Sequence, residues 1–75
     1  MNVDELERMR PYEALIVIKA LKLRKKYEEL LVLRYVDDLS CDEIADKKHK
    51  EVQTIRNEVS LARKQFNKYV NDLCK

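Results

Sequence analysis

The chain contains no glycine, and its only proline is Pro11. Charged residues make up 40% of the 75 residues, a composition typical of a small all-helical domain with a solvated exterior. A chain of this length buries only about 60% of its unfolded surface, which leaves little core in which to build a deep enzyme pocket. We therefore expect one all-α domain spanning residues 1–75.

The hydropathy pattern and the few reactive residues narrow the functional class. The longest uncharged apolar run is "ALIVI" at 14–18, far shorter than the ~20 residues of a membrane-spanning helix, and nothing resembles a signal peptide. Cys41, Cys74 and the single histidine, His49, match neither a CxxC motif nor a zinc site. No catalytic triad, glycine-rich phosphate loop or carboxylate pair in an apolar setting is present. We expect a soluble, cytoplasmic binding module with reduced thiols, not an enzyme, and no metal, cofactor or membrane partner.

The first 23 residues show apolar residues at helical spacing in two stretches. One or two helical turns are indicated near the start, where apolar residues lie three apart at Val3, Leu6 and Met9. A second helix is predicted from Pro11, a residue suited to a first turn, and it is expected to be the most buried helix. Its apolar face consists of Leu15, Ile18 and either Leu21 or Leu23, widened by Ile16 and Val17.

A basic cluster separates this helix from the next apolar block, and we place a break near Lys25 or Lys26. The segment "YEELLVLRYVDD" at 27–38 then predicts another helix, with apolar residues at helical rather than alternating spacing. Asp37 and Asp38 end it, since acidic side chains oppose the negative end of a helix dipole.

Residues 39–50 carry the signals of a short helix between two breaks. Ser40 can cap its start, and Glu43, three residues further on, completes a capping box. The segment "CDEIADKK" has acidic residues in its first turn and lysines in its last, and it directs Ile44 and Ala45 inward. About three residues, 48–50, then form the turn, the length found in a helix-turn-helix. The turn requires a left-handed conformation at His49, at a cost of about 1 kcal/mol for a residue other than glycine.

The final segment, "EVQTIRNEVSLARKQFNKYVNDLC" from Glu51, predicts the longest helix. Its apolar stripe, at spacings of three and four, consists of Val52, Ile55, Val59, Ala62, Phe66, Tyr69 or Val70, and Leu73. The end of this stripe, Phe66, Tyr69, Val70 and Leu73, extends past what the short helices need to cover. Part of it can therefore pair with a second copy of the chain, as a homodimer, or pack against residues 3–18.

Positive charge is gathered around the turn and the front of this last helix. The net charge of the whole chain is only +2, but residues 47–64 hold six basic side chains and two acidic ones. Residues 1–46 hold eight basic and eleven acidic side chains. The basic region lies where DNA phosphates lie when a recognition helix enters a major groove. The alternative interpretation is a solvated helix end with ordinary lysines.

The apolar stripe of the last helix fixes which polar residues face outward. Candidate base-contacting residues near its amino end are Gln53, Thr54, Arg56 and Asn57, because arginine can pair with guanine, and asparagine or glutamine with adenine. Candidate phosphate-contacting residues are Lys47, Lys48, Lys50, Arg63 and Lys64. Glu58 accepts from cytosine or pairs with a basic neighbour such as Lys50. The structural alternative for all of these residues is a polar helix exterior.

The segment "LVLRYVDDLSCDEIADKKHKEVQTIRNEVSLARKQF" resembles the fourth conserved region of sigma-70-type factors, which binds the upstream promoter element. The matching features are "LRYV..LS" at 33–40, "EIA" at 43–45, "TI" at 54–55 and "S.ARK" at 60–64. The output domain of LuxR-type regulators has similar spacing, but the "LRY" and "ARK" elements favour the sigma type. Small phage and mobile-element regulators resemble the same region.

The resemblance implies a four- to five-helix bundle with a helix-turn-helix at 40–64 and a recognition helix from residue 51. It also implies a transcription regulator that reads double-stranded DNA in the major groove. In the sigma family this domain touches RNA polymerase through its early helices, where Leu30, Leu31 and Tyr35 are the nearest equivalents or plain core. The other conserved regions of a sigma factor, including the one that melts promoter DNA, have no counterpart here, so we do not expect a complete sigma factor.

The turn departs from the family pattern at three positions. His49 replaces the usual glycine, while Lys48 and Lys50 replace residues that are usually apolar. These lysines indicate either a looser or differently angled second helix, or stronger phosphate contact. The departures also leave open a second function, a protein-interaction module that binds RNA polymerase, a sigma factor or itself and has lost DNA reading.

Overall fold

The computed structural model describes residues 2–73, all of whose regular structure is helical. In chain order the elements are η1 (Val3–Arg8), α1 (Pro11–Ala20), α2 (Lys25–Leu31), η2 (Val32–Val36), α3 (Cys41–Lys48) and α4 (Val52–Leu73). The first is a 3-10 helix, and η2 is a π-helical turn that continues α2 without a break. Taken as one rod, α2 and η2 bring the count to five helices within residues 2–73, which confirms the predicted all-α bundle.

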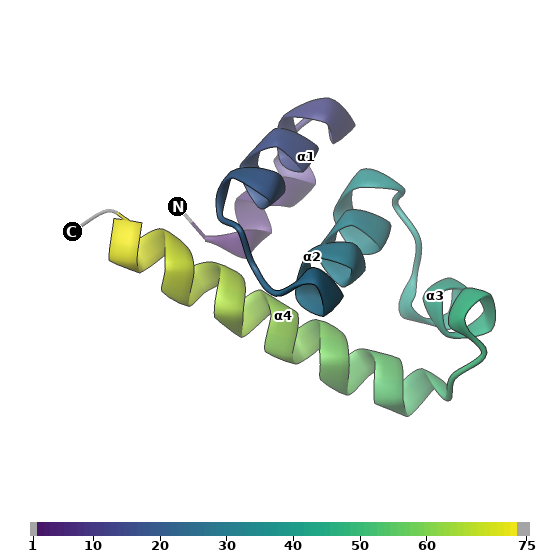
Figure 1. Ribbon diagram of the computed structural model, residues 1–75. Helices are drawn as coiled ribbons and strands as arrows, with labels where there is room; N and C mark the ends of the chain where they lie inside the picture. Colours follow the sequence, from purple (N-terminus) through teal and green to yellow (C-terminus); the bar gives the residue numbers. More distant parts are fainter. Residues whose placement is uncertain (1, 74–75) are drawn as a thin grey trace.

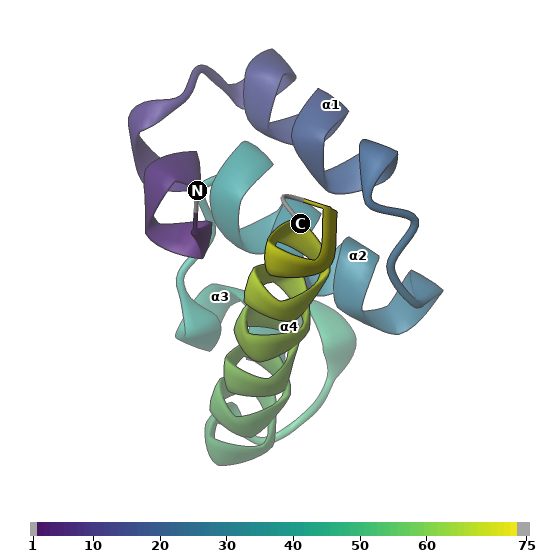
Figure 2. The same ribbon diagram turned by 90° about the vertical axis from the view of Figure 1, so that its left-hand side faces the viewer.

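The long helix α4 runs along one side of the molecule, and α2, α3 and η1 pack on it (Figure 1). α2 lies between α1 and α4, and α3 lies beside the amino end of α4. With α4 in the foreground, the purple segment η1 lies on one side of it and α2 on the other (Figure 2). The amide of Val3 donates to Oδ1 of Asn67 over 2.8 Å, so η1 is joined to the second half of α4.

One apolar core lies between these helices, and every described segment contributes to it. Its largest fully buried side chains are Phe66, Leu6, Ile18, Leu30, Leu31, Ile44 and Ile55. The buried stripe of α4 consists of Ile55, Val59, Ala62, Phe66 and Val70, as the spacing predicts. The predicted inward positions of α3, Ile44 and Ala45, are likewise buried. The core therefore fixes which face of α4 remains free.

The prediction that the helix from Pro11 is the most buried is wrong. Within α1 only Ala14 and Ile18 are buried, whereas Ile16 is 64% exposed. Leu15 and Val17 are partly covered. Because five consecutive apolar residues surround the helix on all sides, only the positions of the neighbouring helices decide which of them face inward.

The apolar residues at the end of α4 were predicted either to form a homodimer contact or to pack against residues 3–18. Phe66 and Val70 are buried inside the single chain, and this part of α4 packs near η1. Leu73 is 72% exposed, so the last position of the stripe is not covered within the described part of the chain, and the homodimer stays a prediction. Cys74, one of the two predicted thiols, lies outside the described residues, whereas Cys41 is a partly buried free thiol.

Within residues 2–73, no helix has the length and apolar character needed to cross a bilayer.

At two of the connections between helices, the backbone adopts a conformation that the sequence did not predict. The break after α1 falls at 21–24, just before the predicted position, and Lys22 there has φ 52°. At the end of η2, the Asp37 amide donates to the Val32 carbonyl over 3.0 Å, which widens the last turn. Asp38 follows with φ 57° and turns the chain toward α3. The acidic pair therefore ends the helix where it was predicted to end.

Candidate nucleic-acid interface

The start of α3 is held by the predicted capping box. Oγ of Ser40 accepts from the Glu43 amide over 3.2 Å, and the Glu43 carboxylate accepts from the Ser40 amide over 3.2 Å. Two amides that have no partner inside the helix are thereby satisfied. This cap fixes where α3 begins.

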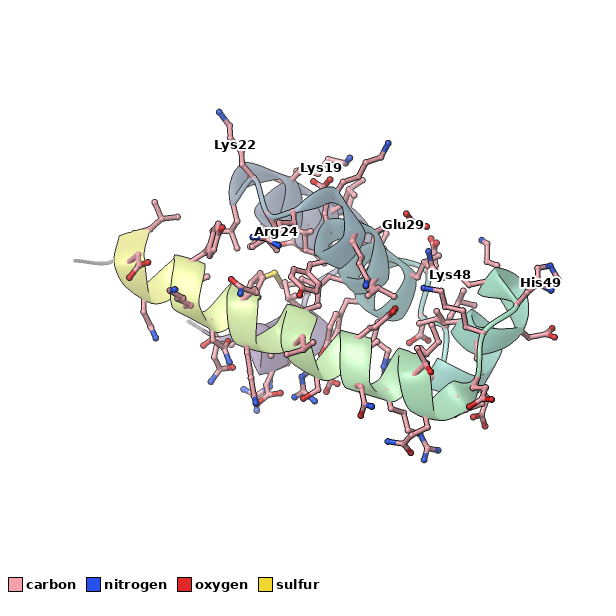
Figure 3. All side chains as sticks on the ribbon, turned by 60° about the horizontal axis from the view of Figure 1, so that its bottom comes forward. Lys19, Lys22, Arg24, Glu29, Lys48 and His49 are labelled. Carbon is pink, nitrogen blue, oxygen red and sulfur yellow. The ribbon has the colours of Figure 1, made fainter. Side chains whose placement is uncertain are left out.

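The turn between α3 and α4 closes around His49, whose backbone is left-handed at φ 57° and ψ 44°. The Lys50 amide donates to the Ala45 carbonyl over 3.0 Å, and the His49 amide donates to the Asp46 carbonyl over 3.3 Å. These two bonds are those of a Schellman motif, which normally places glycine at this position. The predicted left-handed histidine is confirmed, and its side chain points away from the bundle at the tip of the turn (Figure 3).

The four candidate base-contacting residues all lie exposed on the first turns of α4, away from the buried Ile55 and Val59. These residues are Gln53, Thr54, Arg56 and Asn57. Nε2 of Gln53 donates to Oδ1 of Asn57 over 3.2 Å, so two side chains one helical turn apart share a hydrogen bond on this face. The amides are ordered relative to each other while their remaining donors and acceptors face solvent.

Three of the five candidate phosphate-contacting residues have acidic partners within the chain. Nζ of Lys48 lies 2.6 Å from the carboxylate of Glu29 on α2, a pair visible beside the turn (Figure 3). Lys50 lies 3.2 Å from Glu58, and Arg63 lies 2.7 Å from Asp4. The other two, Lys47 and Lys64, are exposed and make no ion pair within residues 2–73.

Glu58 is the most enclosed member of these pairs, because two lysines converge on it. Its Oε1 lies 3.3 Å from Nζ of Lys26 as well as 3.2 Å from Nζ of Lys50. Burial acts to raise the pKa of Glu58, but the hydrogen bonds and the positive charges of Lys50 and Lys26 together outweigh it and leave the pKa below its usual value. The pKa of Glu29 is also lowered, by its hydrogen bond and charge contact with Lys48. The predicted alternative for Glu58, pairing with Lys50, is the one the structure contains.

A polar cleft of about 250 Å³ opens beside this face, between η1, η2, the start of α3 and the middle of α4. Its lining includes three arginines, together with one acidic residue and a thiol: Glu7, Arg34, Tyr35, Cys41, Arg56, Val59, Ser60 and Arg63. The guanidinium carbon of Arg34 lies 5.6 Å from the centre of the Tyr35 ring. Burial raises the pKa of the Tyr35 hydroxyl.

Arg34 is the member of this arginine cleft that sequence reasoning missed. Its place on the 27–38 helix gives no indication that it meets α4. The signal available in the sequence is its place in the "LRYV" motif, next to the buried Tyr35. The structure brings it together with Arg56 and Arg63, which come from another helix.

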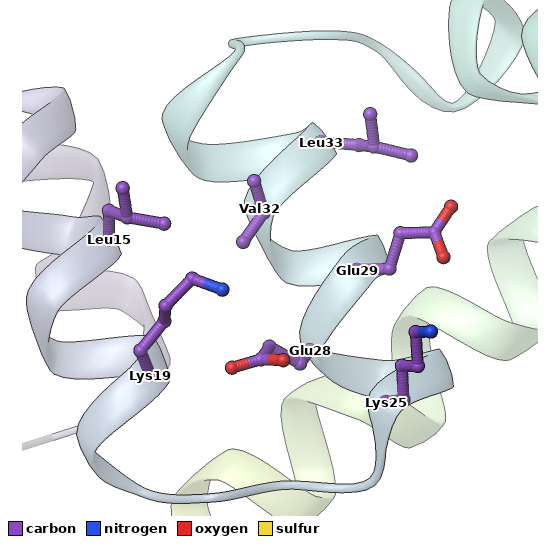
Figure 4. Close-up of a pocket in the computed structure, with 7 residues that line it drawn as sticks. All are labelled: Leu15, Lys19, Lys25, Glu28, Glu29, Val32 and Leu33. Carbon is purple, nitrogen blue, oxygen red and sulfur yellow. The ribbon is translucent and has the colours of Figure 1, made fainter.

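A second, more apolar groove lies between α1 and α2, on another part of the surface (Figure 4). Leu15 and Lys19 on α1 face Glu28 and Val32 across it. The full lining is Leu15, Lys19, Lys25, Glu28, Glu29, Val32 and Leu33. Leu30, Leu31 and Tyr35, named above as the nearest equivalents of a polymerase-contacting surface, are buried core residues.

Comparison with known proteins agrees with this geometry. The family model described as "Sigma-70, region 4" matches residues 20–66, well over half of the chain. The chain is also similar to the ECF RNA polymerase sigma factor SigW of Bacillus subtilis (strain 168), with 36% identity over 55 residues. That match covers 73% of this chain but only 29% of the length of the sigma factor. No solved structure matches the chain significantly.

Proposed function

The chain belongs to the sigma-70 region 4 family of helix-turn-helix DNA-binding domains, and we propose that it is a transcription regulator that reads duplex DNA with the first turns of α4 in the major groove. The observation that carries this proposal is the exposed polar face of α4, in which Gln53 and Asn57 lie one turn apart. Side chains of this kind, at the amino end of the second helix of a helix-turn-helix, have the chemistry that reads base edges.

The proposed roles follow from the position of each side chain on residues 40–64. Gln53, Asn57 and Arg56, with Thr54 beside them, contact base edges, since all four are exposed on the first turns of α4. Lys47 and Lys64 contact phosphates directly. The remaining phosphate contacts, from Lys48, Lys50 and Arg63, require each side chain to leave or share its acidic partner.

The test is a titration of the protein against a pool of random duplexes at low salt, followed by sequencing of the retained DNA. We expect salt-sensitive binding and enrichment of one short sequence. A pool of single strands with the same base composition is the control for general attraction to nucleic acid. Absence of any duplex binding at low salt contradicts the proposal, and binding without enrichment contradicts the base-reading part of it.

A second candidate function is a protein-interaction module that binds RNA polymerase or another sigma factor. Two observations favour it: three of the candidate phosphate contacts are paired internally, and Tyr12 and Ile16 on α1 are 58% and 64% exposed. The test is capture of purified RNA polymerase by a variant in which Arg56, Arg63 and Lys64 are all alanine. Retained stoichiometric capture supports this function, whereas loss of capture by that variant counts against it.

A further inference from the structure

The acidic 3-10 helix η1 lies against the basic side of α4. Its Asp4 carboxylate accepts from Nη2 of Arg63 over 2.7 Å, across 59 positions in the chain. Arg63 is one of the residues to which the proposed function gives a phosphate contact. A carboxylate and a phosphate both bind the guanidinium group through paired hydrogen bonds, so they compete for the same donors.

Glu7, one turn further along η1, borders the arginine cleft together with Arg34 and Arg56. It also borders an adjoining hollow formed by Arg34, Tyr35 and Asp38. Glu7, Arg34 and Arg63 thus line the same cleft, and Asp4 is joined to Arg63 at its edge. Two carboxylates of η1 therefore lie close to arginines of η2 and α4.

The position of η1 is fixed by apolar and backbone contacts, not by these charges alone. Val3 and Leu6 are buried in the core, and the Val3 amide donates to Oδ1 of Asn67. Oδ1 of Asn2 accepts from the Asp4 amide over 2.9 Å and caps the start of the segment. The carboxylates are consequently held beside α4 even when the ion pair between Asp4 and Arg63 is broken.

We propose that η1 is an acidic cover that lowers DNA affinity, because Asp4 and Glu7 occupy the surroundings of Arg63 and Arg34 that DNA phosphates otherwise enter. The proposal rests on the proposed function, since it concerns duplex DNA bound by α4. Arg63 and Asp4 are both largely exposed, so their ion pair is weak enough for a phosphate to replace. The cover therefore reduces affinity without preventing binding.

The experiment compares DNA binding by the full chain and by the double variant Asp4→Asn, Glu7→Gln. Fluorescence anisotropy with a labelled random-sequence duplex is measured between about 50 and 200 mM salt. We expect the variant to bind about threefold to tenfold more tightly at low salt and to show a steeper salt dependence, because the freed arginines release more counterions.

The matched control is the double variant Glu5→Gln, Glu13→Gln, which makes the same change in net charge. Both control residues are exposed, Glu5 borders a separate hollow on η1, and Glu13 lies on α1. An equal gain in the control and in the cover variant overturns the inference, because the effect is then one of overall charge. Failure of all three proteins to bind duplex DNA instead overturns the proposed function and the inference together.

A third variant tests whether Arg63 is the group released. We expect Arg63→Ala to weaken DNA binding more in the background of the cover variant than in the unaltered chain, since Asp4 no longer competes for it. Equal losses in the two backgrounds contradict the inference. Thermal unfolding of each variant is recorded alongside, and a cover variant that binds more tightly while unfolding at an unchanged temperature excludes loss of η1 as the cause.

Discussion

Nζ of Lys50 and Oε1 of Glu58 lie 3.2 Å apart, which ties the turn after α3 to the second turn of α4. Lys26, at the start of α2, binds the same carboxylate oxygen at 3.3 Å. One acidic side chain therefore links three segments that must keep their mutual angles if the polar face of α4 is to enter a groove. Lys50, which stands where the family usually has an apolar turn residue, therefore has an ion-pair partner in Glu58.

We expect Glu58→Gln to reduce stability at neutral pH by about 0.5–1 kcal/mol, because each pair is partly exposed. The folded-state pKa of Glu58 is lowered, so its contribution is complete above the unfolded-state pKa of about 4.3 and is lost as pH falls through the lower folded value. Urea unfolding at pH 7 and at about pH 3 measures the effect. An equal difference between variant and unaltered chain at both pH values contradicts this account.

The left-handed backbone at His49 predicts a stabilising substitution. Replacing His49 by glycine is expected to raise the free energy of unfolding by about 0.5–1 kcal/mol, because glycine adopts φ 57° without a steric cost. The matched control is Lys47→Gly, two residues earlier in the last turn of α3, which should lower stability by about 1 kcal/mol. Denaturant titration measures both, and a loss of stability in the His49 variant rejects the prediction.

The capping box predicts that removing the Ser40 hydroxyl destabilises the protein. Ser40→Ala removes the acceptor for the Glu43 amide and is expected to lower the free energy of unfolding by about 1 kcal/mol. Ser60→Ala, on the exposed surface in the middle of α4, is the control and should change stability by less than about 0.5 kcal/mol. Similar effects of the two substitutions count against the capping contribution.

The proposed DNA-binding face of α4 predicts that one substitution lowers base discrimination and that another lowers affinity for all duplexes. Asn57→Ala is expected to reduce discrimination at one base pair of the selected sequence by about 1–3 kcal/mol, with little change on unrelated duplexes. Lys64→Ala is expected to weaken binding to all duplexes alike and to reduce the salt slope by about one. Titrations of both variants against selected and scrambled duplexes distinguish the roles, and a uniform loss for Asn57→Ala removes it from the base-reading set.

The parts of the fold that were predictable depend on interactions within a few residues. The capping box at Ser40 joins residues three apart, and the left-handed turn at His49 is closed by bonds within six residues. The exposure of Gln53 and Asn57 follows from the buried stripe on the opposite side of the same helix. Each of these features is specified by spacing along one or two helices, so the sequence alone was sufficient to predict it.

The features that were not predictable depend on segments far apart in the chain. Glu29 meets Lys48 across 19 positions and Asp4 meets Arg63 across 59, so no local pattern indicates either pair. Arg34 enters the cleft only because η2 and α4 both border it. The π-helical turn at 32–36 has no distinguishing composition, and the inward face of α1 depends on how its neighbours pack.

Three residues with positive φ, Lys22, Asp38 and His49, stand at the three joints from α1 to α4 within residues 2–73. Each carries a side chain that restricts its backbone before folding as well as after it. The chain therefore gives up less conformational entropy at its corners than one with glycine there, while the folded corners retain some steric strain. Because these two effects oppose each other, substituting glycine at all three joints should raise folding stability by less than the relief of strain alone indicates.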